Sequence, residues 1–111
     1  MTMKPVVFIG NALQELRAFP VTVRREAGYQ LDRLQNGFEP SDWKVLAGLG
    51  SGVREIRIRD ANGAFRIVYV ARFAEALYVL HCFQKKSQKT GKLNRELAAK
   101  RYGELMRERK T

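Results

Sequence analysis

The stretch between residues 53 and 84 constrains the fold of this chain more than any other part. Its first segment, VREIRIRD (Val53–Asp60), alternates apolar and charged residues, as a strand with one solvent-facing side does. The dipeptide Asn62-Gly63 then favours a tight hairpin turn. The next two segments, residues 64–73 and 76–84, are apolar at nearly every position, which is typical of central strands covered on both faces. The stretch therefore predicts a three-stranded antiparallel meander.

Two helices are predicted before the meander, after a short edge strand at residues 5–10. Asn11 can cap the first helix, which must end near Pro20. Asn36-Gly37 supplies the left-handed residue that ends the second. The apolar stripe of the second helix consists of Val23, Ala27, Leu31 and Leu34. The segment from residue 39 to residue 52 is expected to be a connector, and its glycines do not form a phosphate-binding loop, because they follow a loop and open a strand.

A last helix is predicted from about residue 91 to residue 108, with Thr90 as its cap. The apolar residues expected to face the sheet are Leu93, Leu97, Tyr102 and Leu105. The order β-α-α-β-β-β-α predicts one α+β domain over residues 1–111. Its small antiparallel sheet would contain the N-terminal strand and the meander, with two N-terminal helices and one C-terminal helix packed on it.

The composition excludes several classes of protein. A hydrophobic fraction of 45% argues against disorder, and no apolar run approaches the roughly 20 residues that span a bilayer. The N-terminus lacks the pattern of a signal peptide, so a cytoplasmic protein is favoured. Cys82 is expected to be a buried structural thiol and His81 a packed histidine. These neighbours point to opposite faces of a strand, so we expect no metal site and no cofactor.

Positive charge is concentrated at the C-terminal end of the chain. The formal net charge is +10, of which residues 81–111 carry 10 basic and 3 acidic side chains. Such asymmetry favours a polyanionic partner, either nucleic acid or an acidic protein segment. A solvated basic helix is the alternative explanation.

One group of charged residues could act on a phosphodiester. Arg66 interrupts an apolar strand, and arginine is rarely buried unless it is paired, so it either bridges Glu55 or lines a cleft. If the meander pairs in sequence order, Arg57, Arg66 and Lys85 or Lys86 come from three adjacent strands, about 5 Å apart. Cleavage of RNA by its own 2′-hydroxyl needs a base, here Glu55, and cations that stabilise the transition state. The alternative is that Glu55 only pairs with a neighbouring arginine across an exposed sheet.

Three sequence segments resemble the HigB-like host-inhibition toxins, often described as phage-derived proteins, within the RelE/ParE toxin superfamily. They are LQNGFEPSDWKVLAGLGSGVREIRIRD, FRIVYV and LYVLHCFQKKSQKT. The resemblance implies an α+β fold and a metal-independent mRNA endoribonuclease that acts on the ribosome. It also implies a monomeric toxin held by a cognate antitoxin, commonly a helix-turn-helix protein of the HigA type.

The resemblance also implies site residues, with exceptions. Arg57, Arg66 and Lys85 or Lys86 match basic positions of RelE, whereas Glu55 stands where RelE has a basic residue. The tyrosine that follows in RelE, and the C-terminal histidine and tyrosine of other HigB proteins, have no counterpart here, so the general base and acid are not identified. Further cations are expected to hold the RNA backbone or an acidic antitoxin segment: Arg59, Lys89, Lys92, Arg95, Lys100 and Arg101.

Three other functions fit the same sequence. A ParE-like toxin would poison gyrase, although such toxins generally lack the cation set. A non-catalytic RNA- or DNA-binding module would use the same basic face, and an inactive phage remnant would use none. Codon preference and the need for ribosomes are not readable from the sequence.

Overall fold

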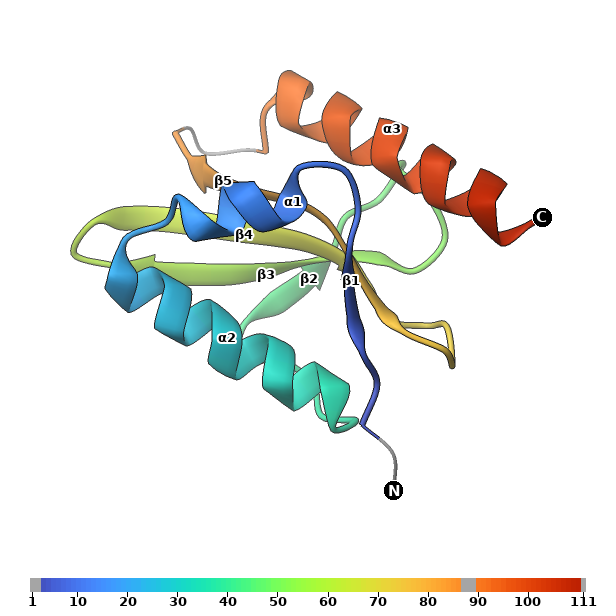
Figure 1. The fold of residues 1–111 in the computed structure, drawn as a ribbon. Helices are drawn as coiled ribbons and strands as arrows, with labels where there is room; N and C mark the ends of the chain where they lie inside the picture. The colour runs from blue at the N-terminus through green and yellow to red at the C-terminus, as the bar shows by residue number, and fades with distance from the viewer. Residues whose placement is uncertain (1–2, 87–89, 111) are drawn as a thin grey trace.

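The computed structural model describes residues 3–86 and 90–110, which form a five-stranded sheet with helices on both faces (Figure 1). The elements in chain order are β1 (Val6–Phe8), α1 (Ala12–Arg17), α2 (Val21–Gln35), β2 (Trp43–Val45), β3 (Val53–Asp60), β4 (Gly63–Val70), β5 (Leu77–Lys85) and α3 (Lys92–Arg109). This is the predicted α+β architecture. No helix among the described residues is both long and apolar enough to cross a lipid bilayer.

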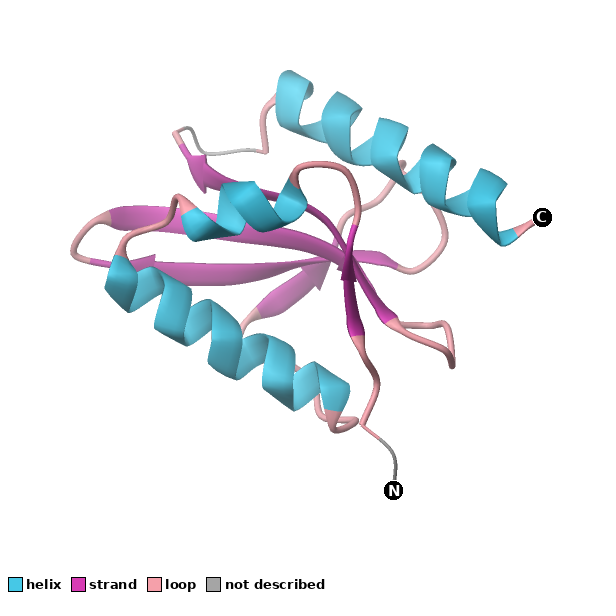
Figure 2. Ribbon diagram, in the orientation of Figure 1, coloured by secondary structure: helices cyan, strands magenta, loops and turns pink. Residues whose placement is uncertain are grey.

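The sheet has the strand order β1-β5-β4-β3-β2, so the predicted meander is confirmed at its centre (Figure 2). Two features differ from the prediction of a four-stranded antiparallel sheet. First, β1 pairs with β5 in parallel, with Val6 opposite Leu77. Hairpins force neighbouring strands to be antiparallel, but β1 is joined to the sheet through two helices and can run in either direction. Second, β2 pairs with β3 inside the segment expected to be a connector.

Each face of the sheet has its own hydrophobic core. On one face α1 and α2 cover Ile56, Ile67 and Val79, and the predicted stripe of α2 is buried there. On the other face α3 covers Val68 and Leu80. The two apolar central strands are therefore sandwiched, as their composition predicted.

The beginning of α3 differs from the sequence-based expectation. Gly91 occupies the cap position, and no side chain caps the helix. The hydroxyl of Thr90 instead donates to Oε2 of Glu55 at 3.1 Å. Leu93 was expected to face the sheet but is 80% exposed, whereas Ala98, Arg101 and Leu105 are buried. The buried face of α3 is thus narrow and includes a charged residue, because Arg101 has an acidic partner described below.

Candidate functional site

The sheet register gathers several cations and one carboxylate on the face that α3 partly covers. Arg57 in β3 lies opposite Arg66 in β4, and Lys44 in β2 lies opposite Glu55 in β3. Directly paired residues of neighbouring strands project on the same side of a sheet. Lys85, at the end of β5, projects on this side one diagonal step from Arg66. The predicted approach of Arg57, Arg66 and Lys85 from three adjacent strands is therefore confirmed, and Lys44 joins them.

Glu55 and Arg66 form an ion pair beneath this surface. They are 1% and 2% exposed, and Arg66 Nε lies 3.6 Å from Glu55 Oε1. The other carboxylate oxygen accepts from Thr90, and Arg66 Nη1 donates to the carbonyl of Phe65. Of the two outcomes that the sequence left open for Arg66, it bridges Glu55. Because both oxygens of Glu55 are engaged and shielded from solvent, this position argues against its expected role as the general base.

The remaining cations of the cluster and the neighbouring Lys86 reach solvent. Arg57 and Lys85 are half-buried, and Lys44 and Lys86 are exposed. None of these four forms an ion pair with a described residue. Partial burial lowers the pKa of Lys85, and the positive charge of Arg66 lowers it further, with Glu55 opposing. The surface thus offers unneutralised positive charge, which is what an anionic ligand requires.

A cavity of about 280 Å³ opens beside the cluster, between the end of β5 and the start of α3. It is lined by Phe83, Lys85, Lys86, Gly91, Lys92, Leu93 and Asn94. Phe83 lies opposite Arg66 in the sheet, so the cavity and the cation cluster are adjacent. Of the predicted residues, Lys85 belongs to both, and Lys86 lines the cavity.

Among the other predicted RNA-binding residues, Arg59 pairs with Ala64, so it projects on the same face as Arg57, and it is exposed. Lys100 and Lys92 on α3 are also exposed, and Lys92 forms an ion pair with Glu96. Arg95 donates to the carbonyl of Ala47 and so joins α3 to the loop before β3. Lys89 lies outside the described residues.

Arg101 does not belong with these surface cations, because it is only 6% exposed. Its Nη1 and Nη2 donate to the two carboxylate oxygens of Glu15 at 2.8 and 3.0 Å, and Nη1 also donates to the carbonyl of Leu80. A guanidinium so engaged has a structural role. The expectation that Arg101 contacts RNA is therefore corrected by its burial and pairing.

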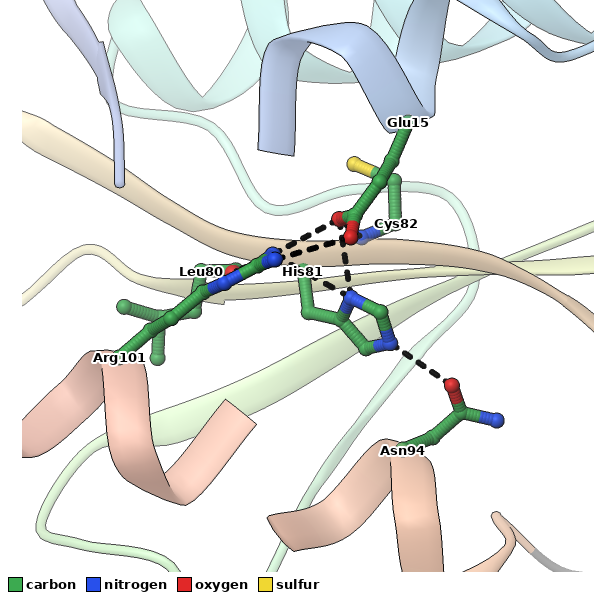
Figure 3. A network of polar contacts seen from close by, with 6 residues as sticks. All are labelled: Glu15, Leu80, His81, Cys82, Asn94 and Arg101. Atoms are coloured by element: carbon green, nitrogen blue, oxygen red, sulfur yellow. Dashed lines mark hydrogen bonds and ion pairs between the residues drawn. The ribbon is translucent and has the colours of Figure 1, made fainter. Parts of the chain in front are cut away.

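Glu15 joins α1, β5 and α3 in a polar network (Figure 3). β1 ends at Phe8, so the edge of β5 beyond Leu80 is open, and Glu15 accepts the backbone N–H of Cys82 there at 3.1 Å. His81 contacts Glu15 through Nδ1 at 2.9 Å and Asn94 through Nε2 at 2.7 Å. His81 is buried, as predicted, but it is the centre of a network rather than an isolated packed side chain.

The surroundings of this network explain why the pKa values of Glu15 and Cys82 differ from their ordinary values. Burial would raise the pKa of Glu15, but hydrogen bonds from His81, Arg101 and Cys82 outweigh it and lower the pKa to about 2. Burial raises the pKa of the Cys82 thiol well above its usual range. A thiol that resists ionisation is a poor nucleophile, so Cys82 has the expected structural character.

Sequence reasoning missed Lys44, Thr90, Glu15 and Asn94 as neighbours of the site. A three-residue strand such as β2 carries too little periodicity to be recognised, so Lys44 had no assigned face. Glu15 and Asn94 are ordinary polar residues of helices, and only the tertiary structure brings them to His81. Among the described residues, no group of three histidine, cysteine, aspartate or glutamate side chains could hold a metal ion.

Comparison with known proteins gives a family for the sequence and a match for the fold. No curated protein matches the sequence. A solved structure of the Escherichia coli toxin RelE, a mutant in the free state with two arginines replaced by alanine, matches with a TM-score of 0.63 at 18% sequence identity. The match covers 95% of this chain and 99% of that one, so the two share a fold. Residues 14–103 match the family described as "Phage derived protein Gp49-like (DUF891)", and the chain belongs to that family.

Proposed function

We propose that this protein is the toxin of a toxin–antitoxin pair and that it stops translation by cutting mRNA. The observation that carries the proposal is the cluster of Lys44, Arg57, Arg66 and Lys85 on one face of a RelE-like sheet. Membership of a phage-derived family supports a role in inhibiting the host.

The cluster suits cleavage by the 2′-hydroxyl without a metal ion. Arg57, Lys85 and Lys86 are accessible and would hold the scissile phosphate and stabilise the charge that develops on it. Arg66 would add its field from beneath, as a positioning residue held by Glu55. These roles need only electrostatics, which is the largest contribution in many phosphoryl-transfer reactions.

Lys85 is a better candidate than Glu55 for the group that removes the 2′-hydroxyl proton. Its pKa is lowered by partial burial and by Arg66, which increases the share of neutral amine near neutral pH. Lys86, at the same end of β5, is then the candidate donor to the leaving 5′-oxygen. On the ribosome, rRNA could supply groups that the chain lacks.

A partner that neutralises the toxin follows from the same surface. An antitoxin with an acidic segment, such as a helix-turn-helix protein of the HigA type, would compete with RNA for Lys44, Arg57 and Lys86. A second function, RNA binding without cleavage, is favoured by one observation: Glu55 and Arg66 are both buried in the free protein.

The deciding experiment is induced expression in a growing bacterial culture with mapping of mRNA 5′ ends. We expect growth arrest and new cuts within translated messages for the wild type, and neither for Lys85→Ala. Arg25→Ala, which removes an exposed charge on α2, is the matched control and should behave as the wild type. Growth arrest with intact mRNA would show that the toxin acts on another target, such as gyrase. A folded wild type that neither arrests growth nor cuts mRNA would leave RNA binding alone.

A further inference from the structure

The cavity beside the cation cluster is lined by both apolar and positively charged side chains. Phe83, which is 8% exposed and stacks on His81, and Leu93, which is 80% exposed, both line it. Lys85, Lys86 and Lys92 supply positive charge around these apolar groups. A flat apolar ligand that carries a negative group could contact the apolar side chains and pair with the lysines.

The side-chain amide of Asn94 is a polar group in the lining of this cavity. Its Oδ1 contacts Nε2 of His81 at 2.7 Å, and Glu15 holds the other side of the same ring. The amide nitrogen of Asn94 points away from His81 (Figure 3), and no described residue accepts a hydrogen bond from it. When Nε2 of His81 donates to Oδ1, this contact holds the amide with its N–H groups turned away from the ring.

We propose that this cavity is a nucleobase subsite and that Asn94 determines which base it accepts; this inference rests on the proposed RNA-cleaving function. Phe83 lies opposite Arg66 on the next strand, so a base against Phe83 would place its own phosphate at Arg57 and Lys85. The volume of about 280 Å³ is near the lower limit for small-ligand pockets, which fits one base rather than several.

The chemistry of the amide predicts the preference. In this orientation the N–H of Asn94 would donate to the keto oxygen of guanine or uracil. Adenine and cytosine present an amino group at the same place and would leave two donors facing each other. Guanine and uracil should therefore be preferred at one position beside the cut.

Binding can be tested without any cleavage. In ¹⁵N-labelled protein the side-chain amide of Asn94 is a separate nuclear magnetic resonance signal, identified by its loss in Asn94→Asp. Guanosine 3′-monophosphate should shift this signal at roughly fivefold lower concentration than adenosine 3′-monophosphate, from the contribution of one hydrogen bond. Inorganic phosphate should move Lys85 and Arg57 signals only. An equal response to both nucleotides, to phosphate, or to an acidic peptide would overturn the subsite.

Cut-site mapping then tests the role of Asn94 in the reaction. Asn94→Asp keeps the oxygen that accepts from His81 but presents an acceptor to the cavity, so the preference should change from guanine and uracil towards adenine and cytosine. Asn94→Ala should relax the preference, and Asn11→Ala, an exposed asparagine without a side-chain cap bond, should not change it. If Asn94→Asp cuts the same bases as the wild type, Asn94 has only a structural role. If the wild type does not cut RNA, the proposed function fails, and the nucleotide titration still decides the subsite.

Discussion

Glu55 and Arg66 form a buried ion pair at the centre of the cation cluster, with 3.6 Å between Oε1 and Nε. Arg66 Nε has no hydrogen-bond partner among the described atoms, and Arg57 faces it directly across the strand pair. The pair therefore holds the Arg66 guanidinium just below the surface at which we propose that a phosphate binds. In that proposal Arg66 acts through its field, which Glu55 partly offsets, because its side chain does not reach solvent.

The pair predicts a marked difference between single and double substitutions. Arg66→Ala leaves the Glu55 carboxylate buried without its partner and should lower the free energy of unfolding by about 3–5 kcal/mol. Arg66→Met combined with Glu55→Leu removes both charges and should come close to the wild-type stability. Urea denaturation followed by circular dichroism measures both. Equal destabilisation by the single and the double variant would contradict the importance of the charge pairing.

Charge-conserving substitutions distinguish the proposed role of Lys85 from that of Lys86. Lys85→Arg keeps the positive charge, but a guanidinium does not release its proton near neutral pH, so cleavage should fall by at least about a hundredfold while RNA affinity is retained. Lys86→Arg is the matched control for charge and should still cut, with a smaller loss. Single-turnover cleavage of a defined RNA, with ribosomes present, gives the rates. Full activity of Lys85→Arg would show that Lys85 acts only as a charge.

The sequence predicted the architecture well because its strongest signals are local. Alternation in β3, the Asn62-Gly63 turn and the stripe of α2 each depend on neighbours within a few residues, and the structure has all three. The parallel pairing of β1 and the short strand β2 depend on contacts between distant segments, which local patterns do not encode.

The site was predicted only in part for the same reason. Strand order and residue parity sufficed to bring Arg57, Arg66 and Lys85 together. Burial is a property of the assembled fold, so the sequence could not separate Arg101, which pairs with Glu15, from the exposed cations of the same helix.

The Glu15 network predicts a defined loss of stability in acid. The pKa of Glu15 is about 2 in the folded protein and about 4.5 as its ordinary value, so its contribution is complete above pH 4.5 and disappears as the pH falls through 2. Glu15→Gln should therefore be less stable than the wild type at pH 7, and the difference should narrow between these two values. Free energies of unfolding for both proteins across this range provide the test. A difference that stays constant down to pH 2 would show that the charge of Glu15 is not what stabilises the network.

Salt dependence distinguishes surface cations from the buried one. Arg57→Ala should weaken binding to a short single-stranded RNA and reduce the slope of log affinity against log salt by about 0.7, as expected for one lost phosphate contact. Arg101→Gln should leave the slope unchanged at a temperature where the variant is folded, because its guanidinium binds Glu15 rather than RNA. A 2′-O-methyl RNA prevents cleavage during the titration, and circular dichroism verifies the fold. If Arg101→Gln lowered the slope as Arg57→Ala does, Arg101 would have to leave Glu15 and reach the phosphates when RNA binds.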